Sequence, residues 1–151
     1  MVGLTRWNIL AGACLFWTVV GVYSAQRPPP AGECPQPRFT GKAPDDYYGR
    51  SNPLKADDRE LEAGRRLYVG GSKKIGCAVC HGESGNGKGP LSGFDPPPRN
   101  FTCAQTVNGV PDGQLFWIIR HGSPGTSMPP HADYNDQQIW QLLLYLRRLA
   151  K

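Results

Sequence analysis

Apolar side chains first recur at helical spacing in residues 57–68, near the middle of the chain. Asp57, followed three residues later by Glu60, predicts a capping box at the start of this helix. The residues that share its apolar face are Leu61, Gly64, Leu67 and Tyr68. Because glycine inside a helix costs about 1 kcal/mol relative to alanine, Gly64 indicates the close approach of a second helix.

The final segment, residues 135–149, carries a second apolar stripe and is the expected partner of Gly64. Asn135, with Gln138 three residues later, predicts where this helix begins. The stripe consists of Ile139, Leu142, Leu143, Leu146 and Leu149. Basic residues in the last turn complement the negative end of the helix dipole, which supports the same assignment.

A shorter helix is predicted over residues 112–120, and Gly122 is expected to end it. No segment shows the alternation of apolar and polar residues that marks a half-buried strand. The 19 glycines and 15 prolines indicate long irregular loops between the helices. These patterns predict a small all-α domain over residues 55–151.

Residues 1–25 have the pattern of an export element that is separate from this domain. Arg6 precedes an apolar run over residues 7–23, which is at the short limit for a membrane span. We expect an uncleaved signal anchor that places everything from Gln26 onward in a bacterial periplasm. Cleavage near residues 24–25, which would release a soluble protein, is the alternative.

Residues 26–54 form an extension that contains seven prolines. Each proline fixes φ and removes a backbone donor, which predicts a semi-rigid spacer between the anchor and the domain. The alternative is an extension that wraps over the domain, and Cys34 favours it. Apart from a leader cysteine and the pair at residues 77–80, only Cys34 and Cys103 remain, a candidate disulfide in an oxidising compartment.

Residues 77–81 read Cys-Ala-Val-Cys-His, which is the attachment signature of c-type haem. In such a site Cys77 and Cys80 form thioethers with the porphyrin, and His81 coordinates the iron. Because the motif occurs once, we expect one covalent haem c. A haem held in this way makes electron transfer the first functional hypothesis.

Three other interpretations of this pentapeptide are weaker. A structural zinc site needs four ligands, and the only other cysteine downstream is Cys103. A thioredoxin-type pair belongs to an alternating strand–helix pattern, which the sequence does not show. A structural disulfide between Cys77 and Cys80 would give no reason for His81 to follow them.

Met128 is the best candidate for the second axial ligand of the iron. It lies in a polar loop, residues 125–130, where a methionine that merely fills a core is out of place. Its thioether is a soft ligand that suits ferrous iron. His131 is the main rival, and His121 is a further candidate. A His/Met pair would raise the reduction potential.

These motifs together resemble those of class I cytochromes c, which carry a single haem with His and Met ligands. The matching segments are residues 64–68, 77–81, 89–90, 127–129 and 142–146. The resemblance implies the cytochrome c fold, in which the first and last helices cross at Gly64, Tyr68 and Tyr145. It also implies that the Pro90 carbonyl accepts the Nδ1–H of His81.

Charge narrows the range of partners. The net charge of +5 is small and mixed in sign, which argues against nucleic-acid binding. Lys73, Lys74 and Lys88 bracket the haem motif and form either a docking patch for an acidic protein or a solvated face. Arg99 is a candidate partner of a haem propionate, with a solvated arginine as the alternative.

The sequence therefore predicts an exported electron carrier and not an enzyme. Its donor would be a quinol-oxidising complex or a periplasmic dehydrogenase, and its acceptor a terminal oxidase or a reductase. Two alternatives stay open. One is a fixed cytochrome c subunit of a larger membrane oxidoreductase. The other is a haem enzyme that acts on peroxide, although no distal acid–base group is evident.

Overall fold

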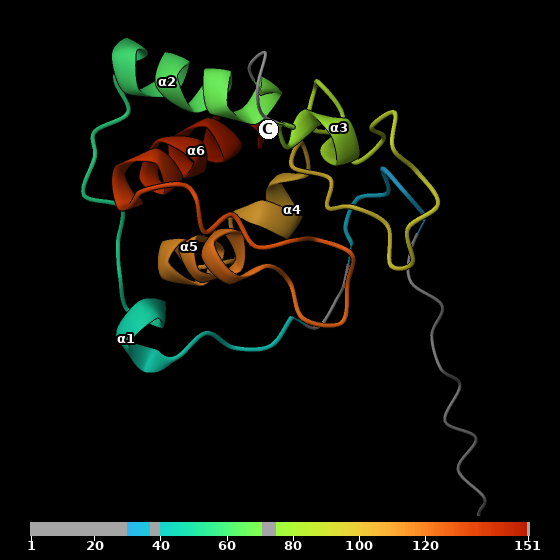
Figure 1. The fold of residues 1–151 in the computed structure, drawn as a ribbon, viewed down its shortest axis with the longest axis horizontal. Coiled ribbons are helices and arrows are strands. Elements are labelled where there is room, and N and C mark those ends of the chain that lie inside the picture. The colour runs from blue at the N-terminus through green and yellow to red at the C-terminus, as the bar shows by residue number, and fades with distance from the viewer. Residues whose placement is uncertain (1–29, 37–39, 71–74, 151) are drawn as a thin grey trace, which may run out of the picture.

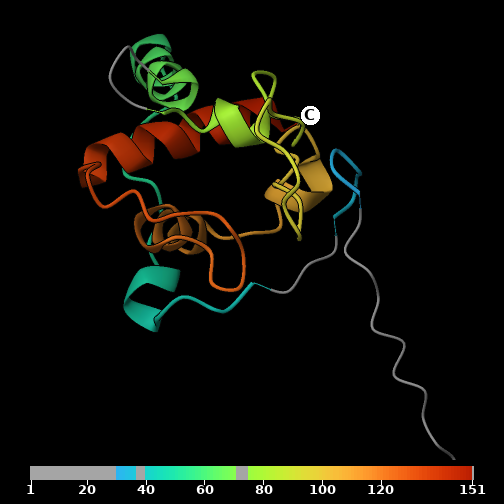
Figure 2. The ribbon, with the colours of Figure 1, turned by 45° about the vertical axis from the view of Figure 1, so that its right-hand side comes forward.

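The computed structural model describes residues 30–36, 40–70 and 75–150, and every regular element in these ranges is a helix. The helices are α1 (Asp45–Tyr48), α2 (Asp58–Val69), α3 (Ala78–His81), α4 (Ala104–Val107), α5 (Asp112–His121) and α6 (Asp136–Leu149). Four of them are stacked in the order α2, α6, α5, α1, with α3 and α4 beside the stack (Figures 1 and 2). The all-α prediction is confirmed.

Two sequence predictions fall outside the described residues. One is the export element with its apolar run over residues 7–23, and the other is the pair Lys73 and Lys74 of the candidate docking patch. Within the ranges that the structure covers, none of the helices has the length and apolar character needed to cross a membrane.

Both long amphipathic helices form within one residue of their predicted bounds. The Asp57 side chain caps α2 by accepting a hydrogen bond from the backbone N–H of Glu60 at 2.9 Å. Asn135 and Gln138 form the complete capping box at the start of α6. The box on α2 stays incomplete, because the Glu60 carboxylate instead accepts a hydrogen bond from Gln141 of α6 at 2.7 Å. This bond ties the two helices together.

α2 crosses α6 at Gly64, as the sequence and the resemblance predict. A Cβ atom at Gly64 would lie 2.1 Å from the backbone oxygen of Gln141, so only glycine lets the two backbones approach this closely. One turn further along, the rings of Tyr68 and Tyr145 have their centroids 5.3 Å apart. Figure 2, in which α2 is seen nearly along its axis and α6 from the side, shows the crossing.

The sequence pattern predicts neither α1 nor α4, because helices of four residues carry no readable periodicity. α1 lies in the proline-rich extension and packs on α5. A Cβ atom at Gly113 of α5 would lie 1.8 Å from the backbone oxygen of Tyr47, which shows how closely the two helices approach. The predicted α5 helix is confirmed, one residue longer than expected and ended by Gly122 at φ +80°.

The described part of the extension lies against the domain. The side chain of Gln114 accepts a hydrogen bond from the backbone N–H of Ala43 at 2.7 Å, and the Asn52 amide donates to the Trp140 carbonyl at 2.9 Å. The structure also contains the Cys34–Cys103 disulfide, with Cα atoms 5.6 Å apart. Residues 40–54 are therefore not a free spacer but a wrapped extension, the alternative that Cys34 favoured.

Arg147 joins the end of α6 to the α4–α5 connection. Its guanidinium donates to the carbonyls of Val107 and Val110, each at 2.5 Å, and pairs with the Asp112 carboxylate at 2.7 Å. The sequence indicated only a favourable charge at the end of the α6 dipole. The structure adds a clamp that fixes where α4 ends and α5 begins.

Replacing Arg147 with alanine is expected to lower the free energy of unfolding by about 2 kcal/mol, because charge-assisted hydrogen bonds to two carbonyls are lost. Arg148→Ala is the matched control. It removes the same side chain from an exposed neighbouring position and is expected to change stability by less than about 0.5 kcal/mol. Denaturant unfolding of the two variant holoproteins measures both effects. Equal losses of unfolding free energy would contradict a stabilising role for the Arg147 contacts.

Candidate haem site

A cavity of about 660 Å³ lies beside α3, and its wall contains most of the predicted site residues. Cys77, Cys80 and His81 reach it from α3 and its N-cap, Arg99 from the following loop, and Met128 from the loop after α5. Its volume falls within the range of roughly 300–1,000 Å³ that is typical of small-molecule and cofactor sites. The apolar part of the wall includes Phe101, Val107, Leu115, Ile119, Leu142 and Leu146.

α3 is a single turn that presents the two thiols and the imidazole together. The backbone N–H of His81 donates to the Cys77 carbonyl at 2.9 Å, which closes this turn. Gly82 ends the helix with φ +81°. The Tyr68 hydroxyl then donates to the Gly82 carbonyl at 2.6 Å. This bond connects the haem motif directly to the α2–α6 crossing.

Cys77 and Cys80 are free thiols in the structure and are not joined to each other. Burial raises the pKa of the Cys77 thiol to about 11 and also raises the pKa of Cys80. Among the residues described, no three His, Cys, Asp or Glu side chains gather as a set that could hold a metal ion.

His81 is held by a backbone carbonyl and by an aromatic ring. Its Nδ1 lies 3.0 Å from the Arg99 carbonyl oxygen, and its ring stacks on Phe101 at a centroid distance of 4.4 Å. A carbonyl oxygen can only accept, so Nδ1 carries the proton. In this tautomer the lone pair that can coordinate iron is on Nε2.

The carbonyl that orients His81 is that of Arg99, and the expectation that it belongs to Pro90 is wrong for this structure. The residues on either side of Pro90 are bonded to the backbone of the haem motif. The N–H of Gly89 donates to the Cys80 carbonyl at 3.0 Å and that of Leu91 to the Val79 carbonyl at 2.9 Å. The chain approaches the imidazole ring later, at residues 98–101.

The Arg99 side chain lines the cavity and also reaches the proline-rich extension. Its guanidinium donates to the Gln36 carbonyl at 2.7 Å and to the Thr40 hydroxyl at 3.2 Å. The alternative of a freely solvated arginine therefore does not describe it. Its role as a partner of a haem propionate stays a prediction.

The structure places two of the three candidate axial ligands at the cavity. Met128 and His131 both line it, whereas His121 does not and lies against the rings of Tyr47 and Trp117. The backbone N–H of Met128 donates to the Thr126 hydroxyl at 3.1 Å, which shapes its loop. Burial lowers the pKa of His131, which favours the neutral imidazole, the form that can bind iron.

Sequence reasoning missed the contribution of the extension to the cavity wall. Thr40, Lys42 and Tyr48 line the cavity, although they precede the expected domain boundary at residue 55. In the sequence, only Cys34 indicates that the extension contacts the site, because a bond to Cys103 brings the extension toward the loop that follows the haem motif. The pattern of prolines alone predicts no contact with the site.

An apolar cavity that gathers a Cys-x-x-Cys-His turn, behind a crossing of the first and last helices, defines a c-type cytochrome. Residues 59–146 match the family described as cytochrome c oxidase, cbb3-type, subunit III, and the chain belongs to this family. Its fold is accordingly the cytochrome c fold. The domain carries covalently bound haem c with iron.

A chain of the reducing HAO-like protein complex of Kuenenia stuttgartiensis is similar in structure, with a TM-score of 0.55 and 29% sequence identity. The similarity covers 66% of the present chain and 47% of the other. The present chain therefore matches about half the length of that relative.

The residues of the cavity fit haem c. Two neighbouring thiols are in place to form the thioethers, and the bond from Nδ1–H of His81 leaves Nε2 as the nitrogen that can coordinate iron. The surrounding wall is mainly apolar, which suits a porphyrin ring. When bound, the haem supplies a metal centre that changes its charge by one electron.

Proposed function

We propose that the chain is a single-haem electron-transfer protein in which His81 and Met128 are the axial ligands. The observation that carries this proposal is that the wall of one cavity brings together the Cys77–Cys80 pair, the oriented His81 and the thioether of Met128. With both axial positions filled by side chains, the site favours electron transfer over the binding of a small substrate.

The chain's own residues act by holding and tuning the haem. The α2–α6 crossing fixes α3 through Tyr68, and the Arg99 carbonyl fixes the orientation of His81. The apolar wall excludes water, which limits the rearrangement that accompanies a change of charge. The Met128 thioether favours the ferrous state and raises the reduction potential.

We place this activity outside the cytoplasmic membrane, with residues 7–23 as a signal anchor. The pattern of Arg6 and the apolar run that follows it supports export, and a disulfide such as Cys34–Cys103 persists mainly in an oxidising compartment. The donor would be a quinol-oxidising complex or a periplasmic dehydrogenase, and the acceptor a terminal oxidase or a reductase.

A fixed subunit of a larger oxidoreductase is the second candidate. The matching family is described as a subunit of cytochrome c oxidase, and the similar structure belongs to a protein complex. Purification of the full-length protein from membranes in mild detergent separates the two candidates. A stoichiometric complex would favour the subunit, and a single polypeptide would favour the mobile carrier.

Haem content and a redox titration of the holoprotein test the proposed function itself. We expect one haem iron per chain, a reduced pyridine adduct with both vinyl groups saturated, and one Nernstian wave for one electron. More than one haem, or an unsaturated vinyl group, would contradict the assignment of Cys77 and Cys80. Rapid turnover of peroxide by the unmodified protein would instead favour the haem enzyme.

A further inference from the structure

Gln36 is a buried polar residue in the proline-rich extension, two positions after Cys34. The residue is 2% exposed, and a buried amide is costly unless its donor and acceptor both find partners. No part of the haem motif is near it in the sequence, and nothing in the pattern of the extension explains it. Its partners in the fold show what it does.

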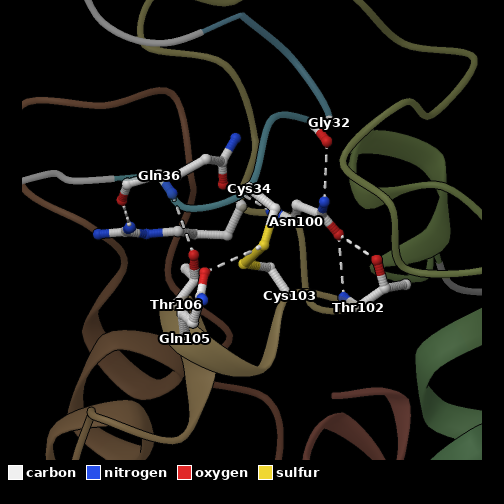
Figure 3. Close-up of a disulfide and its surroundings, with 9 residues drawn as sticks. Gly32, Cys34, Gln36, Asn100, Thr102, Cys103, Gln105 and Thr106 are labelled. Carbon is white, nitrogen blue, oxygen red and sulfur yellow. Dashed lines mark hydrogen bonds between the residues drawn. A yellow bond between two sulfur atoms is a disulfide. The ribbon is translucent and has the colours of Figure 1, made fainter. Parts of the chain in front are cut away.

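The amide of Gln36 binds the backbone of the loop that approaches the haem motif. Its Oε1 accepts from the backbone N–H of Asn100 at 2.7 Å, and its Nε2 donates to the Pro98 carbonyl at 3.4 Å. Its own backbone carbonyl accepts from the Arg99 guanidinium at 2.7 Å. Figure 3 shows Gln36 in the extension, beside the disulfide. Three consecutive residues of the loop are thus held by one residue.

The bond from Asn100 matters most, because of the peptide group to which it belongs. The N–H of Asn100 and the carbonyl of Arg99 are the two ends of one planar peptide unit and point in opposite directions. Gln36 accepts from one end, and the Nδ1–H of His81 donates to the other at 3.0 Å. The result is a chain of hydrogen bonds from Gln36 through one peptide group to the imidazole. Bonds in such a chain polarise and strengthen one another.

Contacts of Gln36 itself and of the residues just before it hold Gln36 in place. Cys34 is bonded to Cys103, and the backbone N–H of Gln36 donates to the Thr106 hydroxyl of α4 at 3.1 Å. The Asn100 amide donates to the carbonyl of Gly32 at 2.9 Å, as Figure 3 also shows. The disulfide is therefore the fixed point of the extension: it attaches the chain to the domain two residues before Gln36, whose side chain then binds the loop.

We propose that Gln36 is a positioning residue for His81 and that, through the Arg99 carbonyl, it sets the donor strength of the axial imidazole. The proposal rests on the proposed role of His81 as an iron ligand. A stronger bond from Nδ1–H makes the imidazole a more basic ligand, which favours the more highly charged ferric state. Gln36 therefore lowers the reduction potential, and its loss raises it.

The test compares Gln36→Leu with Asn52→Ala in the holoprotein. Asn52 is the matched control, because it also joins the extension to the domain through its amide, but its partner is Trp140 on α6. We expect Gln36→Leu to raise the reduction potential and to speed the exchange of the His81 Nδ1 proton with solvent, measured by NMR. Asn52→Ala should change neither quantity, although both variants lose stability.

A second variant keeps the proposal testable if Gln36→Leu yields no folded holoprotein. Cys34→Ala combined with Cys103→Ala removes the fixed point and should shift the potential and the proton exchange in the same direction. An unchanged potential and unchanged exchange in a folded variant would overturn the role of Gln36 alone. If the unmodified holoprotein lacked the spectrum of a histidine-ligated haem, the ligand assignment would fall as well, and with it both proposals.

Discussion

Replacing Met128 with alanine is expected to remove the weak red charge-transfer band of the oxidised holoprotein and to lower its reduction potential by roughly 100 mV. The band arises from the bond between the methionine sulfur and ferric iron, so it disappears with the thioether. The potential falls because the soft sulfur binds ferrous iron more tightly than ferric iron. For one electron, each tenfold change in this preference corresponds to about 59 mV.

The matched control is His131→Ala, which removes the other candidate ligand from the wall of the same cavity. It is expected to keep the red band and most of the potential. Absorption spectra and redox titrations of the two variants compare the candidates directly. If the band survived in Met128→Ala and the low-spin spectrum were lost in His131→Ala, the assignment would pass to His131. The emptied coordination position in Met128→Ala should also bind cyanide, which the unmodified protein should bind slowly.

Replacing Gly64 with alanine is expected to lower the free energy of unfolding by about 3 kcal/mol, because the added methyl group has no space. It would lie 2.1 Å from the Gln141 oxygen and 3.0 Å from the Tyr145 Cβ, and α6 backbone atoms cannot move aside as a side chain can. The gain in helix propensity, about 1 kcal/mol, does not offset the forced separation of α2 and α6.

Gly49→Ala is the control for Gly64→Ala. Both substitutions add one methyl group, but only at Gly49 is there room for it. Gly49 has an ordinary helical φ of −77°, and a Cβ atom there would lie 3.7 Å from its nearest neighbour. We expect its effect on stability to stay below about 0.5 kcal/mol. Denaturant unfolding of both holoproteins decides the matter, and a small effect at Gly64 would mean that the helices can separate at little cost.

The parts of the fold that were predictable are those encoded locally. Residues 57–68 and 135–149 carry both a helical period and a capping residue, and the two helices form within one residue of the expected ends. The path of the extension was not predictable in this way. It is fixed by bonds between residues far apart in the sequence, such as the one that joins Gln36 to Asn100 across 64 positions. No short window contains both partners.

The same distinction between local and distant contacts applies to the residues of the haem site. Cys77, Cys80 and His81 lie within one turn, so the spacing of three side chains along the chain is enough to identify them. The acceptor for His81 is a backbone carbonyl, which every residue possesses, so the sequence carries no mark of which one is used. The family pattern indicated Pro90, and the fold uses Arg99. The binding of Met128 to iron is a prediction from the sequence, and the spectra of Met128→Ala test it.

The disulfide has a further consequence for the integrity of the molecule. The described chain between α3 and α4 contains no helix, and Leu91 within it is 51% exposed, which makes this stretch a natural point for proteolytic nicking. A cut there would leave Cys77, Cys80 and His81 on one fragment and Met128 on the other. The Cys34–Cys103 bond and the α2–α6 crossing would still span the break. The nicked protein is therefore expected to migrate as one polypeptide until a reductant is added, and to keep its spectrum meanwhile.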